Sequence, residues 1–157
     1  MNAKKNSDVM HREFASISAK AGLKEAFQEM KKNLQGPIQS PGLVVLDEHG
    51  KCVGLLTLDD LMKELGMLYN DACDKPGQKD WADKFFNQCE IAGMREVSAI
   101  MSARGITVDA GDGFESTCEL ILGKNLNLVP VLDEASKVVG IITRRTVLDE
   151  LGPKMFR

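Results

Sequence analysis

The sequence predicts an α+β protein built from two copies of a strand–helix–strand–strand–helix unit. Residues 44–65 recur without a gap as residues 130–151, with GLLT at 54–57 matching GIIT at 140–143. In each copy two short apolar runs flank a turn, and apolar residues at helical spacing follow. Uninterrupted apolar strands favour sheets that are covered on both faces. A duplication of this kind indicates the architecture before any single element is assigned.

The first unit starts after residue 7, with an expected strand at 14–18 and an amphipathic helix over 23–34. Its hairpin strands, 43–46 and 53–56, are joined by a turn in which Gly50 can adopt a positive φ. Thr57 then begins a second helix. The apolar residues on the expected inner faces of these helices are Leu23, Ala26, Phe27, Met30, Leu34, Leu58, Leu61, Met62 and Leu65.

The second unit follows the same plan. Its expected elements are a strand at 106–108, a helix over 114–121, hairpin strands at 129–132 and 138–142, and a helix from Thr143. The offset between the copies falls from 91 residues at Met10 and Met101 to 86 at Gly54 and Gly140. The first unit therefore holds an insertion, rich in Pro and Gly and expected to be a loop, at 36–42.

The chain is thus expected to divide into a first unit at 1–68, a linker at 69–95 and a second unit at 96–157. The linker contains a turn-rich break at 71–77, followed by an aromatic helix. Its apolar stripe consists of Trp81, Phe85, Cys89 and Ala92, with Phe86 beside it. Two interpretations stay open: the stripe packs on its own domain, or it forms a docking surface for a second subunit or another protein.

The composition of the chain argues against nucleic-acid-binding and membrane-spanning proteins. The 157 residues carry a formal net charge of −3 and a pI near 5.4, which argues against binding nucleic acid through a basic face. The apolar runs are too short to span a membrane. The first eight residues have no apolar signal core behind them, so a cytoplasmic protein is expected.

The cysteines do not indicate a metal or catalytic site. They stand at 52, 73, 89 and 118, with no CxxC pair, and the chain has only two histidines. Apolar surroundings predict reduced thiols that act as small hydrophobic residues. No metal is expected, because ligand clusters are missing, and nothing local would activate a thiolate.

The pair Thr57 and Asp60 has two interpretations. A Thr followed three residues later by an acid is typical of a capped helix start. The same junction of strand and helix presents backbone N–H groups to an anion, and the Asp60 carboxylate could accept two hydrogen bonds from a sugar diol. The motif by itself does not decide between them.

As a set, these motifs resemble a tandem pair of CBS domains, the regulatory modules named after cystathionine β-synthase, also called a Bateman module. The resemblance rests on DVM at 8–10 and AIM at 99–101, on PVLD at 130–133, and on VGLLT at 53–57 with VGIIT at 139–143. It implies two units packed about a pseudo-twofold axis with two clefts between them. Such clefts bind AMP, ADP, ATP or S-adenosylmethionine, and the modules commonly form disc-like dimers that regulate another protein without catalysing a reaction.

The first cleft fits the family's ribose-phosphate motif. GLLTLDD at 54–60 matches it throughout, so the resemblance places Thr57 near phosphate and Asp60 on the ribose hydroxyls. The opposite unit is expected to complete the base pocket. The proposed adenine contacts are Leu55, Gly105, Ile106, Thr107, Leu126, Asn127, Leu128 and Pro130. For Ile106 and the neighbouring Val129, core packing is an equally open interpretation.

The second cleft departs from the motif, because Thr146 stands where the first cleft has Asp60. A single hydroxyl cannot hold a diol as a carboxylate can. This cleft would use Thr143 and Thr146 with residues 15–16 and 40–42. The inserted loop would fill or reshape it, so one nucleoside site per chain is expected.

Arg144 and Arg145 open the last helix, where cations oppose the helix dipole. Such a conflict can mark a functional site, and the hypothesis is that one of them meets phosphate near the pseudo-twofold axis. The alternative is that both are exposed or paired with an acid. Lys124 is a further candidate for phosphate.

The leading prediction is a stand-alone regulatory protein that binds an adenosine compound and signals to an unidentified partner protein, as a homodimer through its CBS units. The alternative is a structural dimer or adaptor whose clefts bind no ligand. A small enzyme is least favoured, because no paired acid–base residues stand out.

Overall fold

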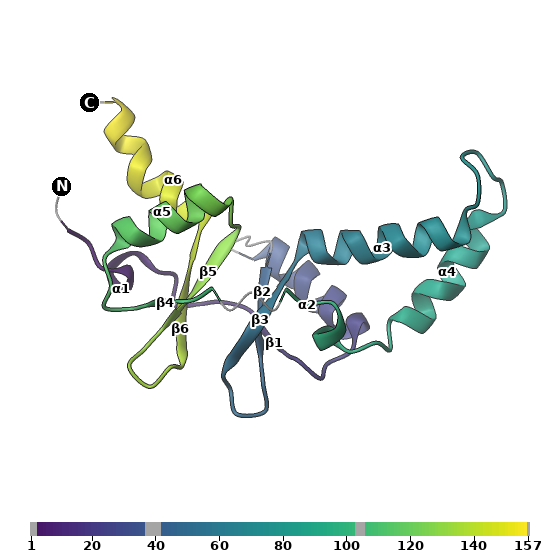
Figure 1. Ribbon diagram of the computed structural model, residues 1–157, viewed down its shortest axis with the longest axis horizontal. Coiled ribbons are helices and arrows are strands. Elements are labelled where there is room, and N and C mark those ends of the chain that lie inside the picture. Colours follow the sequence, from purple (N-terminus) through teal and green to yellow (C-terminus); the bar gives the residue numbers. More distant parts are fainter. Residues whose placement is uncertain (1–2, 37–41, 103–105, 157) are drawn as a thin grey trace.

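The computed structural model describes residues 3–36, 42–102 and 106–156. These residues form two three-stranded sheets of the same topology (Figure 1). The first sheet contains β1 (Ser16–Ser18), β2 (Gly42–Leu46) and β3 (Cys52–Thr57). The second contains β4 (Val108–Asp109), β5 (Leu128–Leu132) and β6 (Val138–Thr143). In both sheets the first strand is parallel to the second and the hairpin strands are antiparallel, which confirms the predicted α+β duplication.

The two hairpins agree in detail. In each hairpin the register shifts directly after the residue that pairs with the motif glycine. The shift lies between Val45 and Leu46 in the first hairpin and between Val131 and Leu132 in the second. In each turn one Asp carboxylate accepts two backbone N–H groups, Asp47 at 2.8 and 2.9 Å and Asp133 at 2.9 Å from both donors. The backbone hydrogen bond from Lys51 is the largest of the influences that lower the pKa of Asp47. The turn chemistry is therefore repeated together with the strands.

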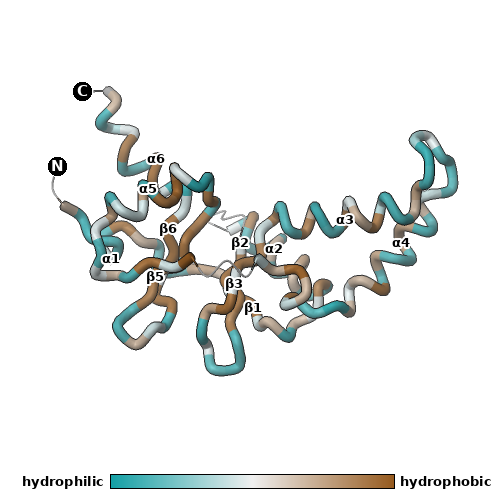
Figure 2. Tube along the Cα trace, in the orientation of Figure 1, coloured by the Kyte–Doolittle hydropathy of each residue, from teal (hydrophilic) through white to brown (hydrophobic). Residues whose placement is uncertain are grey.

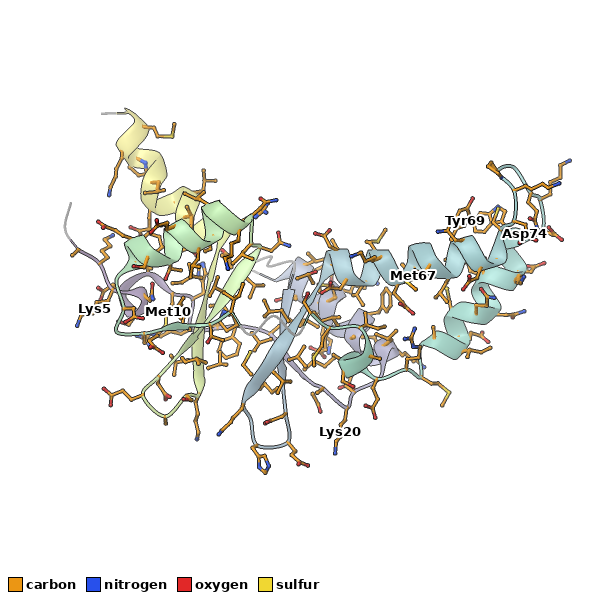
Figure 3. The ribbon with its side chains drawn as sticks, viewed as in Figure 1. Lys5, Met10, Lys20, Met67, Tyr69 and Asp74 are labelled. Atoms are coloured by element: carbon orange, nitrogen blue, oxygen red, sulfur yellow. The ribbon has the colours of Figure 1, made fainter. Side chains whose placement is uncertain are left out.

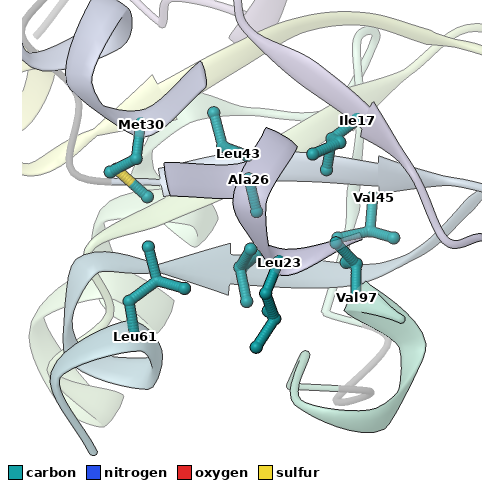
Figure 4. Close-up of a cluster of buried hydrophobic side chains, with 9 residues drawn as sticks. Ile17, Leu23, Ala26, Met30, Leu43, Val45, Leu61 and Val97 are labelled. Atoms are coloured by element: carbon teal, nitrogen blue, oxygen red, sulfur yellow. The ribbon is translucent and has the colours of Figure 1, made fainter. Parts of the chain in front are cut away.

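Four helices cover the sheets. In the first unit these are α2 (Leu23–Gln35) and α3 (Leu58–Ala72), and in the second α5 (Phe114–Lys124) and α6 (Arg144–Leu151). Figure 2 shows the most hydrophobic segments along the strands. The first core, shown in Figure 4, contains Ile17, Leu23, Ala26, Met30, Leu43, Val45, Leu56, Leu61 and Val97. The second contains Phe114, Cys118, Ile121, Val129, Val131, Ile142 and Val147.

Each core is completed by the segment that starts the other unit. Val97, from the short 3-10 helix Val97–Ala99, is fully buried in the first core. Conversely, Met10 packs against the second core (Figure 3), next to the short helix α1 (Asn6–Val9). The buried Asn6 side chain donates to the Asp109 carbonyl at 2.8 Å and accepts from the Thr117 hydroxyl at 2.8 Å. Packing therefore crosses the boundaries of the sequence repeat and joins the units into one body.

Two glycines allow the segment that starts each unit to pass close to a strand of the other unit. Ser102 pairs with Leu55 on β3, and His11 pairs with Ile141 on β6, each through two backbone hydrogen bonds. A Cβ on Gly54 would lie 2.6 Å from the Ser102 carbonyl oxygen, and one on Gly140 would lie 2.7 Å from that of His11. The glycine of the repeated Gly-apolar-apolar-Thr motif is thus required by the close crossing of another backbone.

The linker forms an arm. α3 runs on to Ala72, and α4 (Trp81–Ala92) returns antiparallel to it, so the two helices project from the body (Figure 1). The Tyr69 ring packs edge-on against Trp81, with centroids 5.1 Å apart, and lies 6.4 Å from Phe85. The buried Glu64 carboxylate pairs with Arg95. Trp81 and Phe85 of the aromatic stripe therefore make contacts within the chain.

Some expected core residues lie at the surface instead. Phe27 is 38% exposed and Met62 is 56% exposed. Met62 lies about 100° around α3 from the buried Leu61, at the edge of the apolar face, where solvent reaches it. Phe27 opens onto a groove between α2, α3 and α4, and Phe86 on α4 is also exposed.

Candidate functional site

A cavity of about 270 Å³ lies where β3 and α3 of the first unit meet the second unit. We call it the Asp60 cavity. Its lining residues are Cys52, Gly54, Leu55, Thr57, Asp59, Asp60, Lys63, Ser102, Ile106, Thr107, Lys124, Asn125, Leu126, Asn127, Leu128 and Pro130. The structure thus gathers most of the residues that the sequence assigned to one site. Gly105, assigned to the same wall, lies outside the described residues.

The start of α3 shapes the floor of this cavity. The Thr57 hydroxyl accepts the Asp60 N–H at 3.2 Å, and Asp60 Oδ2 accepts the Thr57 N–H at 2.9 Å. The capping interpretation is therefore correct. It uses only one carboxylate oxygen, and Asp60 still lines the cavity, so capping does not prevent Asp60 from meeting a ligand.

Two lysines line the cavity together with the carboxylates of Asp59 and Asp60. Lys124, expected from the sequence, ends α5, and Lys63 lies on α3. Sequence reasoning missed Lys63, although its position three residues after Asp60 places both on one helix face. The two ammonium groups balance the charges of the two carboxylates, and the positive end of the α3 dipole adds an attraction for an anion near Thr57.

The opposite wall is apolar. Leu55 comes from β3, Leu126 from the segment after α5, and Ile106 from the segment before β4. Ile106 also packs against the second core, so both of its proposed roles are compatible. Val129 is fully buried in that core and does not line the cavity, so core packing is the correct interpretation for it. Cys52 also lines the cavity, and burial raises the pKa of its thiol.

The second cleft differs at its centre. Thr143 and Thr146 are 5% and 4% exposed, and neither lines the Asp60 cavity. The Thr143 N–H donates to Thr146 Oγ1 at 3.1 Å, and the two hydroxyl oxygens are 3.3 Å apart. Both hydroxyls are therefore engaged in starting α6, and the assignment of Thr143 to a ligand site is not supported by its burial.

Phe14 adds to this asymmetry. It occupies the repeat position of Gly105 and packs against the buried Val44, Leu128 and Ile141 between the units. A depression of about 240 Å³ remains beside it, lined by residues of α2 and the segment 13–15. Residues 40 and 41, expected in this cleft, lie outside the described residues.

The two arginines of α6 do not extend into the Asp60 cavity. Arg144 Nη2 donates to the Asn125 carbonyl at 2.9 Å and to Asn125 Oδ1 at 2.6 Å, and Nε donates to the Leu126 carbonyl at 2.9 Å. Arg145 lies 3.8 Å from Asp149, with both side chains exposed. Arg144 is thus engaged by carbonyl groups, and Arg145 pairs with an acid, as the alternative interpretation expects for it.

Within residues 3–36, 42–102 and 106–156, no three His, Cys, Asp or Glu side chains gather closely enough to hold a metal ion. In the same ranges no helix is both long and apolar enough to cross a bilayer.

The family model of the CBS domain matches residues 7–66 and 97–153. The chain belongs to the CBS domain family. Among curated proteins, this CBS pair is 31% identical over 104 residues to the uncharacterized protein MJ1225 of Methanocaldococcus jannaschii. That match covers 63% of the CBS pair and 32% of the relative, so the CBS pair spans about a third of that protein.

Solved structures share the fold of this CBS pair. The CBS domain pair of protein MJ0100, in complex with 5′-methylthioadenosine and S-adenosyl-L-methionine, superposes with a TM-score of 0.71 at 21% identity, covering 97% of this chain and 98% of the other. CBSX2 in complex with AMP superposes with a TM-score of 0.68 at 18% identity, covering 98% of both chains. The arrangement is therefore that of a Bateman module, with two β-α-β-β-α repeats packed about a pseudo-twofold axis.

Proposed function

We propose that this CBS pair binds one phosphorylated adenosine compound in the Asp60 cavity and, in the cytoplasm, passes its occupancy to a partner protein. The observation that carries the proposal is the gathering of Thr57 and Asp60 from one unit with an apolar wall from the other. Similar CBS pairs have been solved with AMP and with S-adenosylmethionine, which supports the adenosine class. The proposed role is regulatory, not catalytic.

The ligand is proposed to lie across the cavity. Adenine fits between Leu55 and the second-unit residues Ile106 and Leu126, which offer apolar faces to a planar ring. The ribose diol meets Asp60 Oδ1, since Oδ2 already accepts the Thr57 N–H. A carboxylate gives a diol two charge-assisted hydrogen bonds, which are stronger than neutral ones.

The phosphate is proposed to lie near the start of α3, between Lys63 and Lys124. Two ammonium groups and the helix N-terminus attract a phosphate and offset the carboxylates of Asp59 and Asp60, whereas S-adenosylmethionine carries no phosphate to meet them. We therefore expect AMP or ADP to bind more tightly than S-adenosylmethionine. The ratio of the two Kd values should fall as the salt concentration rises, because salt screens exposed charges.

Binding is tested by calorimetry and by thermal melting with adenosine, AMP, ADP, ATP and S-adenosylmethionine. A ligand that binds only the folded state raises the melting temperature. In Asp60→Asn the amide oxygen still caps α3 but offers the diol no charge, so we expect the Kd for AMP to rise about tenfold or more. Asp149→Asn on α6 makes the same charge change outside the cavity and should leave Kd unchanged.

Failure of every adenosine compound to bind or to shift the melting temperature would overturn the proposal. The protein would then be better described as a dimeric adaptor. Tight binding that is equal in wild type and Asp60→Asn would place the ligand elsewhere.

We further propose that the output passes through a homodimer formed by the CBS units. Met62 on α3 and Leu148 on α6 occupy the same repeat position and are 56% and 69% exposed, and Leu122 on α5 is also exposed. Large exposed apolar side chains are a feature of many interfaces. Light scattering should give a dimer mass for wild type and a monomer mass for the Met62→Lys, Leu148→Lys double variant. Met94→Lys, an equally drastic change near the arm, should leave the mass unchanged.

A further inference from the structure

The segment between α5 and β5 is held to the start of α6 by one side chain. The Arg144 guanidinium donates to the carbonyls of Asn125 and Leu126 and to the Asn125 side chain, at 2.6 to 2.9 Å. The Arg144 backbone N–H adds a bond to the Asn127 carbonyl at 3.2 Å. Three consecutive residues of the segment are therefore fixed from α6.

The energetics of this contact follow from the two helix ends that meet there. A cation in the first turn of α6 opposes the dipole of that helix. The same cation lies just beyond the C-terminus of α5, where carbonyl groups carry partial negative charge and cations are favourable. Asn125 caps α5 in the left-handed conformation, with φ 54°. Arg144 thus satisfies the end of α5 while sitting at the start of α6.

The segment held in this way is a wall of the Asp60 cavity. Residues 124–127 all line it, and Leu126 supplies part of its apolar face. Arg144 itself does not line the cavity. In the first unit the matching position is Leu58, which packs against the first core instead. The contact to the cavity wall is therefore a feature in which the two units differ.

We propose that Arg144 is a positioning residue for the ligand: its side chain fixes Asn125 and Leu126 in the wall against which adenine stacks, without touching phosphate. The proposal rests on the function proposed above. A wall that is already ordered in the ligand-free protein loses less conformational entropy when the ligand binds. Arg144 therefore contributes to affinity through the base and equally for every adenosine ligand.

Calorimetry with adenosine and AMP tests this role. In Arg144→Ala we expect the Kd to rise about three- to tenfold for both ligands by the same factor, as loss of a few exposed charged hydrogen bonds allows. Arg144→Lys keeps the charge but lacks the planar fork that spans two carbonyls, so it should not restore affinity. Arg145→Ala, one residue away and facing Asp149, is the matched control and should leave both Kd values unchanged.

A rise in Kd for AMP with no change for adenosine would identify a phosphate contact and overturn the proposal. Unchanged Kd values for both ligands would overturn it as well. Full recovery in Arg144→Lys would show that charge alone suffices, again against positioning.

Hydrogen exchange in the ligand-free protein gives a second readout that does not depend on nucleotide binding. In Arg144→Ala the peptide covering 124–128 should exchange faster, while the hairpin 42–57 keeps its wild-type rate. Arg145→Ala should change neither. If wild type binds no adenosine compound, the proposed function fails, yet faster exchange confined to 124–128 still supports the fixing of the wall. Unchanged exchange there, or faster exchange throughout the chain, would overturn it.

Discussion

Replacing Gly140 by Ala should destabilise the protein through one identified contact. A Cβ at this position would lie 2.7 Å from the His11 carbonyl oxygen and 2.7 Å from Met10 Sδ, whereas ordinary contacts are 3.4 to 4 Å. The Met10 side chain is flexible and can turn away. The His11 carbonyl cannot move freely, because it accepts the Ile141 N–H at 2.9 Å.

The magnitude follows from two opposing terms. Inserting a methyl group into a packed contact costs about 1–3 kcal/mol. Alanine restricts the unfolded chain more than glycine does, which returns about 0.4–1 kcal/mol. The expected net loss is about 1–2 kcal/mol, and at about 2–4 °C per kcal/mol for a chain of this length the melting temperature should fall by about 2–8 °C.

Gly66→Ala is the matched control. Gly66 lies within α3, and a Cβ there meets no atom within 4 Å. The same chemical change should therefore stabilise the protein by about 0.5–1 kcal/mol, the helix preference for alanine over glycine. Calorimetric melting and urea denaturation of both variants measure the contrast. A Gly140→Ala protein that melts at or above the wild-type temperature would refute the crossing of residues 10 and 11 over β6.

Three further predictions concern other contacts. Arg95→Ala leaves the buried Glu64 carboxylate unpaired and should cost about 1–3 kcal/mol by urea denaturation; an unchanged midpoint would show that the pair contributes nothing. Asn6→Ala and Thr117→Val should each destabilise, with a coupling energy above about 0.5 kcal/mol in a double-mutant cycle, and simple additivity would contradict the buried hydrogen bond. Burial raises the pKa of Cys52, so its thiolate is scarce at neutral pH. Alkylation of Cys52, followed by peptide mapping, should be slow at pH 7, accelerate steadily as the pH is raised and slow again with bound AMP; rapid reaction at pH 7, or indifference to AMP, would contradict this.

Sequence reasoning reached the strands, the helices and the cap at Thr57 because these depend on local patterns, and the duplication allowed each unit to check the other. It could not show which core Val97 or Met10 would fill, since the two units offer equivalent cores and only tertiary packing distinguishes them. The contacts of Arg144 could not be predicted for a different reason. A long side chain reaches many partners, and its acceptor at Asn125 lies 19 residues away in the chain. Two cations at the start of α6 suggested an anionic ligand. In the structure, Arg144 instead meets the partial negative charge of the carbonyl groups at the end of α5.

The residues that differ between the two units favour ligand binding in the Asp60 cavity over binding in the second cleft. Thr146 replaces Asp60 and is engaged in capping α6. Phe14 stands at the repeat position of Gly105 and packs between the units. Arg144 replaces Leu58 and secures residues 125 and 126 on the far side of the Asp60 cavity. Two of these changes remove a carboxylate or open space from the second cleft. The third stabilises the wall of the Asp60 cavity. Together they argue against two equivalent sites. They favour one ligand per chain, a stoichiometry that calorimetry reads directly.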